Sequence, residues 1–457
     1  VNSISSEEPM NLPAPVQSIL TRLRAEGFSS YAVGGCVRDS LLGASPKDWD
    51  ICTSAMPEQM IRVFSGEHLV MTGLKHGTLT VILDHIPYEI TTYRLDGKYT
   101  DHRHPDRVSF VGRIDQDLSR RDFTVNAMAC DLSGTVLDPF GGQQDLSRRT
   151  IRCVGDPEAR FSEDALRVLR ALRFASVLNF EIDSATDRAV RQLYPTLSKI
   201  ASERIREELI KLLCGPGARR ILLAYPEIIT FLIPCLQDAV GYDQQNPHHL
   251  YTLWEHTALA VENVPPDPVL RVTMLLHDCG KPQARTTDEA GIGHYRGHQA
   301  ISASLAEKTL KRLRFDHTSS DRIIKLVKAH DIPLSAERKL LLRRLNEFGE
   351  RDLRALFLVH MADRIATGTR NPDHAREHCR ELNQALDLLL SEHPCFSLKD
   401  LQVNGRDLLA QGLEGKQIGE ALQYLLDQVI DGTLPNERGA LLAALEKLKT
   451  IRRTAQP

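Results

Sequence analysis

A glycine pair, Gly34 and Gly35, is the first feature of the chain that suggests chemistry. It lies between a short apolar segment, expected to be a strand, and a predicted helix over 36–42. Because these residues lack side chains, the backbone can approach a ligand closely and direct N–H groups toward it, an arrangement that favours phosphate. Arg38, about one turn into the helix, would add a fixed positive charge.

Two carboxylates follow at a spacing that suits a divalent cation. Asp48 and Asp50 are two residues apart in an expected strand, so both side chains would leave the same face. Such groups repel each other unless a cation lies between them, and Mg²⁺ takes oxygen ligands while keeping substrate phosphates in its shell. The combination indicates a nucleotidyl-transfer site; an ordinary turn followed by two surface aspartates is the alternative.

A predicted hairpin supplies a third carboxylate. Segments 77–83 and 88–93 alternate or are β-branched, and 84–87 would form the turn. Glu89 lies in the middle of the second strand. It either faces the aspartate pair as a catalytic residue or faces solvent, and both interpretations stay open here.

The order Gly-Gly-x-x-Arg-Asp, then Asp-x-Asp, resembles the class II tRNA nucleotidyltransferase and bacterial poly(A) polymerase superfamily. The resemblance implies that Asp48 and Asp50 hold Mg²⁺ and act in catalysis. It also implies that Gly34, Gly35 and Arg38 bind the nucleotide.

Residues 120–127, Arg-Arg-Asp-Phe-Thr-Val-Asn-Ala, match another motif of this superfamily. The match implies that Arg121 contacts the nucleotide phosphate, and we expect the arginine pair to lie at a helix start. A triphosphate needs fixed cations in addition to Mg²⁺, which agrees with this assignment. The turn 138–142 matches a motif linked to motion of the head domain, so the catalytic domain should end near 145–152.

Beyond the predicted head the apolar pattern becomes helical. Asp164, Arg167, Arg170 and Arg173 recur every three residues, which would place them on one helix face beside a parallel apolar row. They resemble the superfamily's Glu-Asp-x-x-Arg motif, which implies that they bind the nucleotide. A carboxylate only accepts hydrogen bonds and a guanidinium only donates them. An Asp–Arg pair therefore fits the donor and acceptor of cytosine and adenine. With uracil or guanine it would place acceptor against acceptor and donor against donor.

Two further segments are interpreted from the resemblance. Residues 95–110 show no periodicity and are rich in charge, so we expect a loop beside the site. Members of the superfamily have a flexible loop here, which implies a role in the switch from C to A addition. The helix over 201–208 matches the last head motif and would brace the preceding helix.

A second chemistry begins after the break at Asn246-Pro247. The adjacent pair His277-Asp278 closes an apolar helix, and other histidines flank it. The pattern resembles the HD metal-phosphohydrolase superfamily, which implies a metal site formed by His256, His277, Asp278, His298, His330 and Asp363. Such ligands suit Mn²⁺, Fe²⁺, Co²⁺, Ni²⁺ or Mg²⁺. An HD fold kept only for architecture is the alternative.

Composition excludes several other classes of protein. With a formal net charge of −3, the chain cannot coat nucleic acid indiscriminately, so RNA contacts need local basic patches. Nine scattered cysteines without a Cys-x-x-Cys motif are typical of a reduced, cytoplasmic protein. No apolar run is long enough to span a membrane, and the first residues lack the features of a signal peptide.

We expect an α+β protein with a small mixed-sheet nucleotidyltransferase head followed by an all-α neck, body and tail. The predicted parts are a loose leader over 1–16, the head over 17–150, a helical neck and RNA-binding region over 151–240, an HD domain over 245–372, and a helical, tRNA-binding tail over 374–457.

The resemblance implies addition of CCA to the 3′ end of tRNA from CTP and ATP. The expected partners are therefore these nucleotides and the 3′ end and acceptor/T-arm of tRNA, without DNA or membrane, for a monomer or homodimer. Enzymes that add only A, and poly(A) polymerases, share the motifs. A different alternative is an HD phosphohydrolase with a nucleotide-binding regulatory head.

Overall fold

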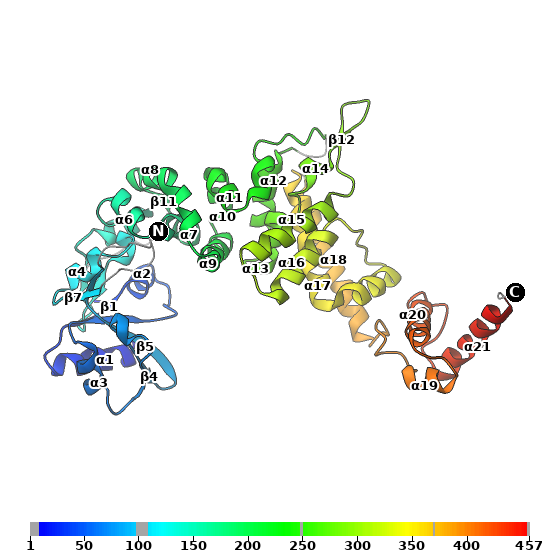
Figure 1. Ribbon diagram of the computed structural model, residues 1–457, viewed down its shortest axis with the longest axis horizontal. Coiled ribbons are helices and arrows are strands. Elements are labelled where there is room, and N and C mark those ends of the chain that lie inside the picture. The colour runs from blue at the N-terminus through cyan, green and yellow to red at the C-terminus, as the bar shows by residue number, and fades with distance from the viewer. Residues whose placement is uncertain (1–8, 97–107, 247–249, 369–370, 455–457) are drawn as a thin grey trace. The chain divides into compact units, whose positions relative to one another are not determined.

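The computed structural model describes residues 9–96, 108–246, 250–368 and 371–454. The chain forms two compact units, one comprising residues 1–234 with 312–315 and the other comprising 235–311 with 316–457. Figure 1 shows a sheet with helices in the first unit and mainly helices in the second, where the short strands β12 (Thr286–Thr287) and β13 (Gly293–His294) also pair. The predicted α+β class is confirmed.

The first unit contains a seven-stranded sheet of strand order β3-β4-β5-β2-β1-β8-β9. Only the β2–β5 pair is parallel, so the sheet is mixed as predicted. Its strands are β1 (Ser30–Val33), β2 (Asp50–Thr53), β3 (His68–Val70), β4 (Thr78–Leu83), β5 (Ile86–Thr92), β8 (Ala129–Cys130) and β9 (Val136–Leu137).

The predicted hairpin is β4–β5, with a tighter turn than expected. Asp84 and His85 both have positive φ, 49° and 65°, and β5 begins at Ile86, so two residues rather than four make the turn. Such two-residue turns match the twist of the strands they join. The parallel register then places Glu89 of β5 opposite Asp50 of β2.

The helix α1 (Ala14–Ala25) packs against β1 and buries four apolar residues at helical spacing. It begins at Ala14, inside the predicted leader, and Pro15 lies in its first turn, where proline is well tolerated because its missing N–H would have no helical partner. The backbone N–H of Met10 also donates to Gly134 O. The boundary of a loose leader at residue 16 is therefore wrong, and residues 1–8 lie outside the described part.

The segment 95–110 is not a loop over its whole length. Its ends pair as the antiparallel strands β6 (Arg94–Asp96) and β7 (Val108–Phe110). The pattern was too short to show this, because each strand has three residues. Residues 97–107, the remainder of the predicted loop, lie outside the described residues.

Helices make up most of the rest of the first unit, together with the short parallel strands β10 (Thr150–Ile151) and β11 (Glu181–Ile182), and beyond the head they follow the predicted helical pattern. The buried row Leu166, Leu169 and Leu172 faces the unit's core, and α7 packs against α9. The helices are α2 (Gly35–Leu41), α3 (Pro57–Val63), α4 (Ile114–Ser119), α5 (Gly142–Ser147), α6 (Pro157–Glu163), α7 (Leu166–Val177), α8 (Ser184–Leu193), α9 (Ser202–Leu213), α10 (Ala218–Ala224) and α11 (Pro226–Leu232).

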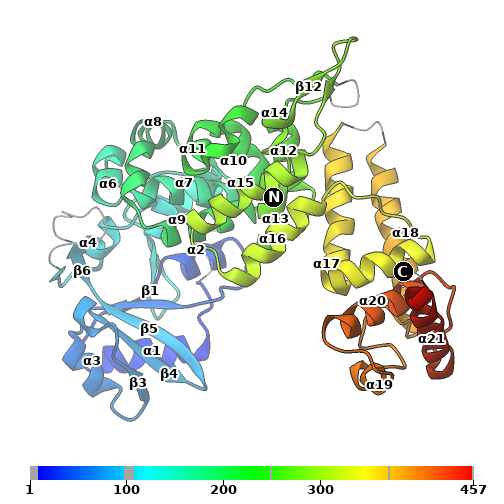
Figure 2. The ribbon, with the colours of Figure 1, turned by 45° about the vertical axis from the view of Figure 1, so that its right-hand side comes forward.

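In the second unit α12, α13, α16 and α17 pack against one another around a common core (Figure 2). The helix α17 is broken at Gly349, whose φ of 73° only glycine adopts readily. The helices are α12 (Leu253–Glu262), α13 (Pro268–Leu276), α14 (Lys281–Ala284), α15 (His298–Arg312), α16 (His317–Ala329), α17 (Arg338–Ala366), α18 (Pro372–Ser391), α19 (Gly405–Ala410), α20 (Lys416–Ile430) and α21 (Arg438–Thr454).

Within the described residues, no helix combines the length and apolar character needed to cross a membrane.

Candidate functional site

A cavity of about 690 Å³ in the first unit is lined by all eight predicted nucleotide-binding residues and by both predicted Mg²⁺ ligands. Eight basic and four acidic side chains line it, so it suits an anionic ligand with a cation. The predicted residues in the lining are Gly34, Gly35, Arg38, Asp48, Asp50, Arg121, Asp164, Arg167, Arg170 and Arg173.

Gly34 is required both by its backbone and by its neighbour. It precedes α2 with a φ of 81°, and a Cβ built there would lie 2.7 Å from Nη1 of Arg121. The Arg121 guanidinium therefore lies directly against the glycine backbone. Arg38, on α2, is oriented by Asp39 and by Asn126, whose Oδ1 accepts from Nη1 at 2.6 Å.

The two aspartates are arranged differently from the prediction. Asp50 is the first residue of β2, but Asp48 lies in the connection before it, so the two are not on one strand. Both line the cavity. Burial raises the pKa of Asp50, Arg121 counteracts this, and the charge of Asp48 raises the pKa further. The two carboxylates therefore repel each other, as predicted.

These carboxylates meet the requirements of a cation site. Neither the Asp48 nor the Asp50 side chain forms a hydrogen bond or ion pair with any residue in the described part of the chain, although eight cations line the same cavity. Their oxygen atoms stay available, which is the donor set that Mg²⁺ prefers. Glu89 does not line the cavity. Its register opposite Asp50 places it on the same face, and its catalytic role stays a prediction.

Arg120 and Arg121 follow the end of α4, so the expected helix start is wrong. A short 3₁₀ helix, Thr124–Asn126, comes only after the motif's aspartate. The turn nevertheless directs both arginines into the cavity lining.

The predicted helix face for Asp164 and Arg167 is also wrong. Asp164 lies between α6 and α7 with extended backbone, and its Oδ1 accepts from the N–H of Leu166 at 3.0 Å. Only Arg167 is helical, in the first turn of α7. The two side chains still line one cavity, because the end of α6 and the start of α7 both face it.

Neighbouring groups hold both members of this pair. Oδ2 of Asp164 pairs with Nη2 of Arg204 at 3.3 Å. Arg167 is 8% exposed and donates to Oε2 of Glu163 at 2.7 Å and to Arg120 O at 3.1 Å. These contacts define the position of each side chain before a ligand binds.

The next two arginines are held by buried carboxylates. Arg170 pairs with Asp122 at 2.5 Å, and Arg173 donates to Oε2 of Glu208, on α9, at 2.8 Å. Burial on its own raises the pKa of Asp122, but the charge and hydrogen bond of Arg170, with smaller contributions from Asn126 and Arg167, together outweigh burial and lower the pKa to about 2. The prediction that the α9 motif braces the preceding helix is confirmed.

Arg120, which also lines the cavity, was not predicted as a nucleotide-binding residue. Sequence reasoning also missed two cations on α9, Arg204 and Lys211. They are seven residues apart on α9 and therefore share a helix face. That spacing was visible in the sequence, but nothing in it showed that this face of α9 turns toward the cavity.

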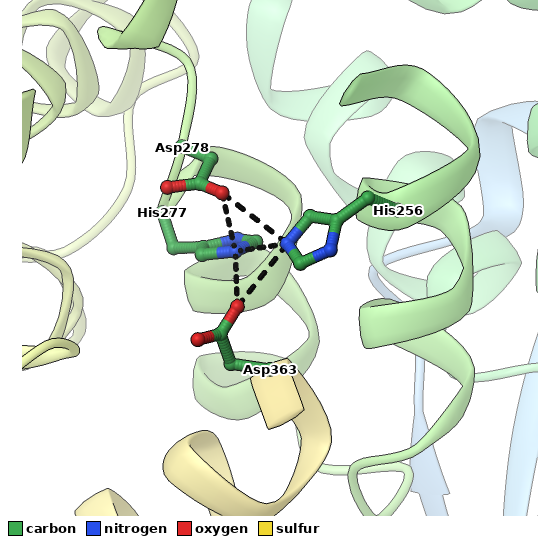
Figure 3. A group of neighbouring side chains, drawn as sticks. All are labelled: His256, His277, Asp278 and Asp363. Carbon is green, nitrogen blue, oxygen red and sulfur yellow. Dashed lines mark hydrogen bonds and ion pairs between the residues drawn. The ribbon is translucent and has the colours of Figure 1, made fainter. Parts of the chain in front are cut away.

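In the second unit the predicted HD residues converge from several helices. His256 comes from α12, His277 and Asp278 from the end of α13, and Asp363 from α17, as Figure 3 shows. Two groups share Asp278: one comprises His256, His277, Asp278 and Asp363, and the other comprises Asp278, His298 and His330.

The geometry of these groups fits a metal ion. The Nε2 atoms of His256 and His277 lie 3.1 Å apart, and those of His298 and His330 lie 3.2 Å apart. Asp278 approaches both pairs, with Oδ2 3.2 Å from His256 and Oδ1 3.1 Å from His298. Facing imidazole nitrogens can share at most one proton, whereas a cation between them satisfies both.

Hydrogen bonds also assign the tautomers that metal binding needs. Nδ1 of His277, His298 and His330 each lies 2.7 Å from a backbone carbonyl oxygen, so Nδ1 carries the proton. Each Nε2 then presents its lone pair to the cluster. Asp278 also pairs with the buried Lys281 at 2.7 Å.

Three families match parts of the chain. Residues 30–152 match the family described as Poly A polymerase head domain. Residues 179–239 match Probable RNA and SrmB- binding site of polymerase A, and residues 298–445 match tRNA nucleotidyltransferase domain 2, putative.

Among curated relatives, the CCA-adding enzyme of Enterococcus faecalis is 32% identical over 438 residues, covering 94% of this chain and 95% of that protein. The CCA-adding enzyme of Leuconostoc mesenteroides is 50% identical over 207 residues, which are 45% of this chain and 51% of that protein. The stronger similarity is thus confined to about half of each chain.

Solved structures agree in fold. The Bacillus stearothermophilus CCA-adding enzyme in complex with CTP has a TM-score of 0.71 at 29% identity, covering 97% of this chain and 100% of that one. The Thermotoga maritima CCA-adding enzyme complexed with tRNA has a TM-score of 0.55 at 21% identity, covering 96% of each. Since the Enterococcus faecalis relative matches nearly the whole chain, this protein belongs to the family of CCA-adding enzymes.

Proposed function

We propose that this protein adds CCA to the 3′ end of tRNA from CTP and ATP without a nucleic-acid template. The observation that carries the proposal is the cavity of the first unit, whose lining combines eight cations with the carboxylates of Asp48 and Asp50, which form no hydrogen bond or ion pair with the residues that the structure describes. The relatives named in the comparisons are called CCA-adding enzymes, and solved structures of two such enzymes are described as complexes with CTP and with tRNA.

The reaction is attack of the tRNA 3′-hydroxyl on the α-phosphate of the nucleotide, with pyrophosphate as the leaving group. Asp48 and Asp50 would hold Mg²⁺, which neutralises phosphate charge when bound. Arg121 and Arg38 line the cavity beside the glycine pair and would bind the phosphates. The protein thereby contributes position and charge rather than a covalent intermediate.

Base selection is assigned to Asp164 and Arg167. Cytosine and adenine each present an amino donor beside a ring acceptor, which fits a carboxylate next to a guanidinium. Uracil and guanine present the reverse order. Each mismatch leaves a buried group without a partner, at a cost of about 1–3 kcal/mol, so UTP and GTP are rejected.

Primer extension tests this function. Transcripts of one tRNA that end before, within and after CC are incubated with each nucleotide alone. The proposal expects C on the first two substrates, A on the third, and neither U nor G. Addition of A only after a complete CC, with no C addition to any transcript, would instead identify an A-adding enzyme. Long A tails would identify a poly(A) polymerase.

We further propose that residues 151–240 and the tail over 374–457 bind tRNA, through its acceptor end and T-arm. The match of residues 179–239 to a family described as an RNA-binding site of polymerase A supports the first part. Residues 298–445, which match a tRNA nucleotidyltransferase domain, include most of the tail.

A second activity is proposed for the HD cluster, as a metal-dependent phosphohydrolase. The specific support is the inward-facing Nε2 lone pairs around Asp278. Its residues would hold Mn²⁺, Fe²⁺, Co²⁺, Ni²⁺ or Mg²⁺, and a bound ion would polarise a phosphoryl group. Cyclic phosphates and phosphorylated RNA ends are the candidate substrates.

Metal content tests the HD proposal independently of activity. The purified protein is dialysed against each ion and its metal content measured by mass spectrometry, and hydrolysis of a 2′,3′-cyclic nucleotide is assayed. We expect bound metal and hydrolysis in the wild type, and loss of both in D363N. D373N, at a side chain 84% exposed, is the matched control. A wild type that binds no ion refutes the metal site.

A further inference from the structure

The carboxylate of Asp117, on α4, lies behind the cavity without lining it. Its side chain is completely buried, yet it carries a charge. Groups from separate parts of the head converge on it: Oδ1 accepts from the backbone N–H of Arg94 at 3.3 Å and from Nε of Arg120 at 3.0 Å, and Oδ2 lies 3.5 Å from Nη2 of Arg121 and 3.6 Å from Sγ of Cys52.

The pairing explains why a buried charge persists here. Burial on its own raises the pKa of Asp117, but the charges of Arg120 and Arg121, together with hydrogen bonds from Arg120 and from the backbone of Arg94, outweigh burial and lower the pKa. A buried carboxylate without such partners would be costly. Arg120 and Arg121 follow Asp117 by three and four residues, so the last turn of α4 brings both to it.

Arg121 depends on this contact for its position. Within the described part of the chain, Asp117 is the only carboxylate that forms an ion pair with Arg121. The other end of the guanidinium lies against Gly34, where no side chain is present to hold it. Nη2 also donates to Sγ of Cys52 at 3.6 Å, which is a weak bond.

The same turn reaches the base-selecting residues. The backbone carbonyl of Arg120 accepts from Nη2 of Arg167 at 3.1 Å. Because Asp117 holds the Arg120 side chain through Nε and through Nη2 at 2.9 Å, it limits movement of that carbonyl as well. One buried carboxylate thus supports contacts made by Arg121 and by Arg167, both of which line the cavity.

We propose that Asp117 is a positioning residue for triphosphate binding, which it achieves by holding Arg121 against Gly34. This inference rests on the proposed function of the cavity. Removing the charge while keeping the shape, as in D117N, frees the guanidinium. The affinity for CTP and ATP should fall roughly tenfold or more, the scale of a lost charge-assisted hydrogen bond. The affinity for CMP, which lacks the two outer phosphates, should be unchanged.

Calorimetric titration of CTP, ATP and CMP tests the inference in the intact protein. The matched control is D115N, since Asp115 lies on the same helix and pairs with the exposed Arg113 instead. D117S, smaller and neutral, replaces D117N if the amide prevents folding. In an R121K background the effect of D117N on CTP affinity should largely disappear, because both changes remove one contact.

Several results would overturn the inference. Equal losses of CTP and CMP affinity would indicate a merely structural role. Additive effects of D117N and R121K would show that Asp117 does not act through Arg121. An unchanged CTP affinity in a folded D117N variant would show that Asp117 does not position the triphosphate site. Failure of the wild type to extend tRNA refutes the proposed function instead, and the titration still reports on Asp117.

Discussion

Buried carboxylates determine where the arginines of the cavity point. Asp122 holds Arg170, and Glu208 holds Arg173. Two other carboxylates that line the cavity, Asp48 and Asp50, have no hydrogen-bond or ion-pair partner within the described ranges of the chain. A flexible cation would lose rotamer entropy each time a nucleotide binds. A cation already held by a buried partner has lost that freedom in folding, so less binding energy is spent on ordering it.

The ion pair between Asp122 and Arg170 predicts how the stability of the folded protein depends on pH. Its pKa is about 2 in the folded protein and about 3.9 in an unfolded chain. Folding is therefore stabilised by about 2–3 kcal/mol at neutral pH. The stabilisation is complete above the unfolded pKa and is lost as pH falls through the folded one.

The variant D122N should be less stable than the wild type by about that amount at pH 7. Denaturant unfolding of both proteins, repeated from pH 7 down to pH 2, measures the difference. We expect it to stay constant above about pH 4 and to shrink below it. A difference that does not vary with pH would show that lost packing, rather than lost charge, causes the destabilisation. D115N, at an exposed pair, serves as the control.

At the scale of elements, the link between α6 and α7 is where the sequence pattern misled. The spacing of Asp164 and Arg167 suggests one continuous helix, but Asp164 bonds to the N–H of Leu166 and so competes with helical bonding. The three-residue recurrence of the charged residues does not reveal this break, because α7 begins directly after it. The residue types therefore predicted the chemistry of the cavity, whereas the break between α6 and α7 depends on one side-chain hydrogen bond.

This geometry sharpens the test of base selection. Exchanging the charges of Asp164 and Arg167 would set an arginine beside Arg204 and an aspartate beside Glu163, so misfolding would confuse the result. The neutral variant D164N avoids this. An amide both donates and accepts, so it should use CTP and ATP less well and admit UTP.

Incorporation rates of the four nucleotides measure this change. We expect discrimination against UTP to fall by roughly tenfold or more, the effect of removing one buried mismatch. The control is D156N, since Asp156 caps α6 and asparagine caps equally well. Selectivity that is unchanged in D164N would leave Asp164 as a partner of Arg204 only.

Other elements show how far local patterns extend. The β4–β5 hairpin was predictable, because alternation and turn residues are local signals. The site in the second unit was predictable as a set of residues only through a resemblance. No spacing in the sequence could show that α12, α13 and α17 bring His256, His277 and Asp363 together, since those contacts form between distant helices.

At the scale of the whole molecule, the chain carries two separate constellations of chemical groups. The arginine-lined cavity belongs to the first unit, and the histidine cluster belongs to the second. Their residues do not overlap. Nucleotide addition should therefore depend on the carboxylates of the cavity and not on metal bound at the histidines.

The central claim is that one cavity, with Asp48 and Asp50, adds both kinds of nucleotide. Its most direct test is extension of a tRNA lacking CCA, with CTP and ATP together, by the wild type, D48A and D50A. D84N, at an exposed turn position of positive φ, is the control. We expect the wild type and D84N to add C, C and A in that order, and D48A and D50A to add neither C nor A while still binding tRNA. Normal addition of either nucleotide by D48A and D50A would contradict the claim.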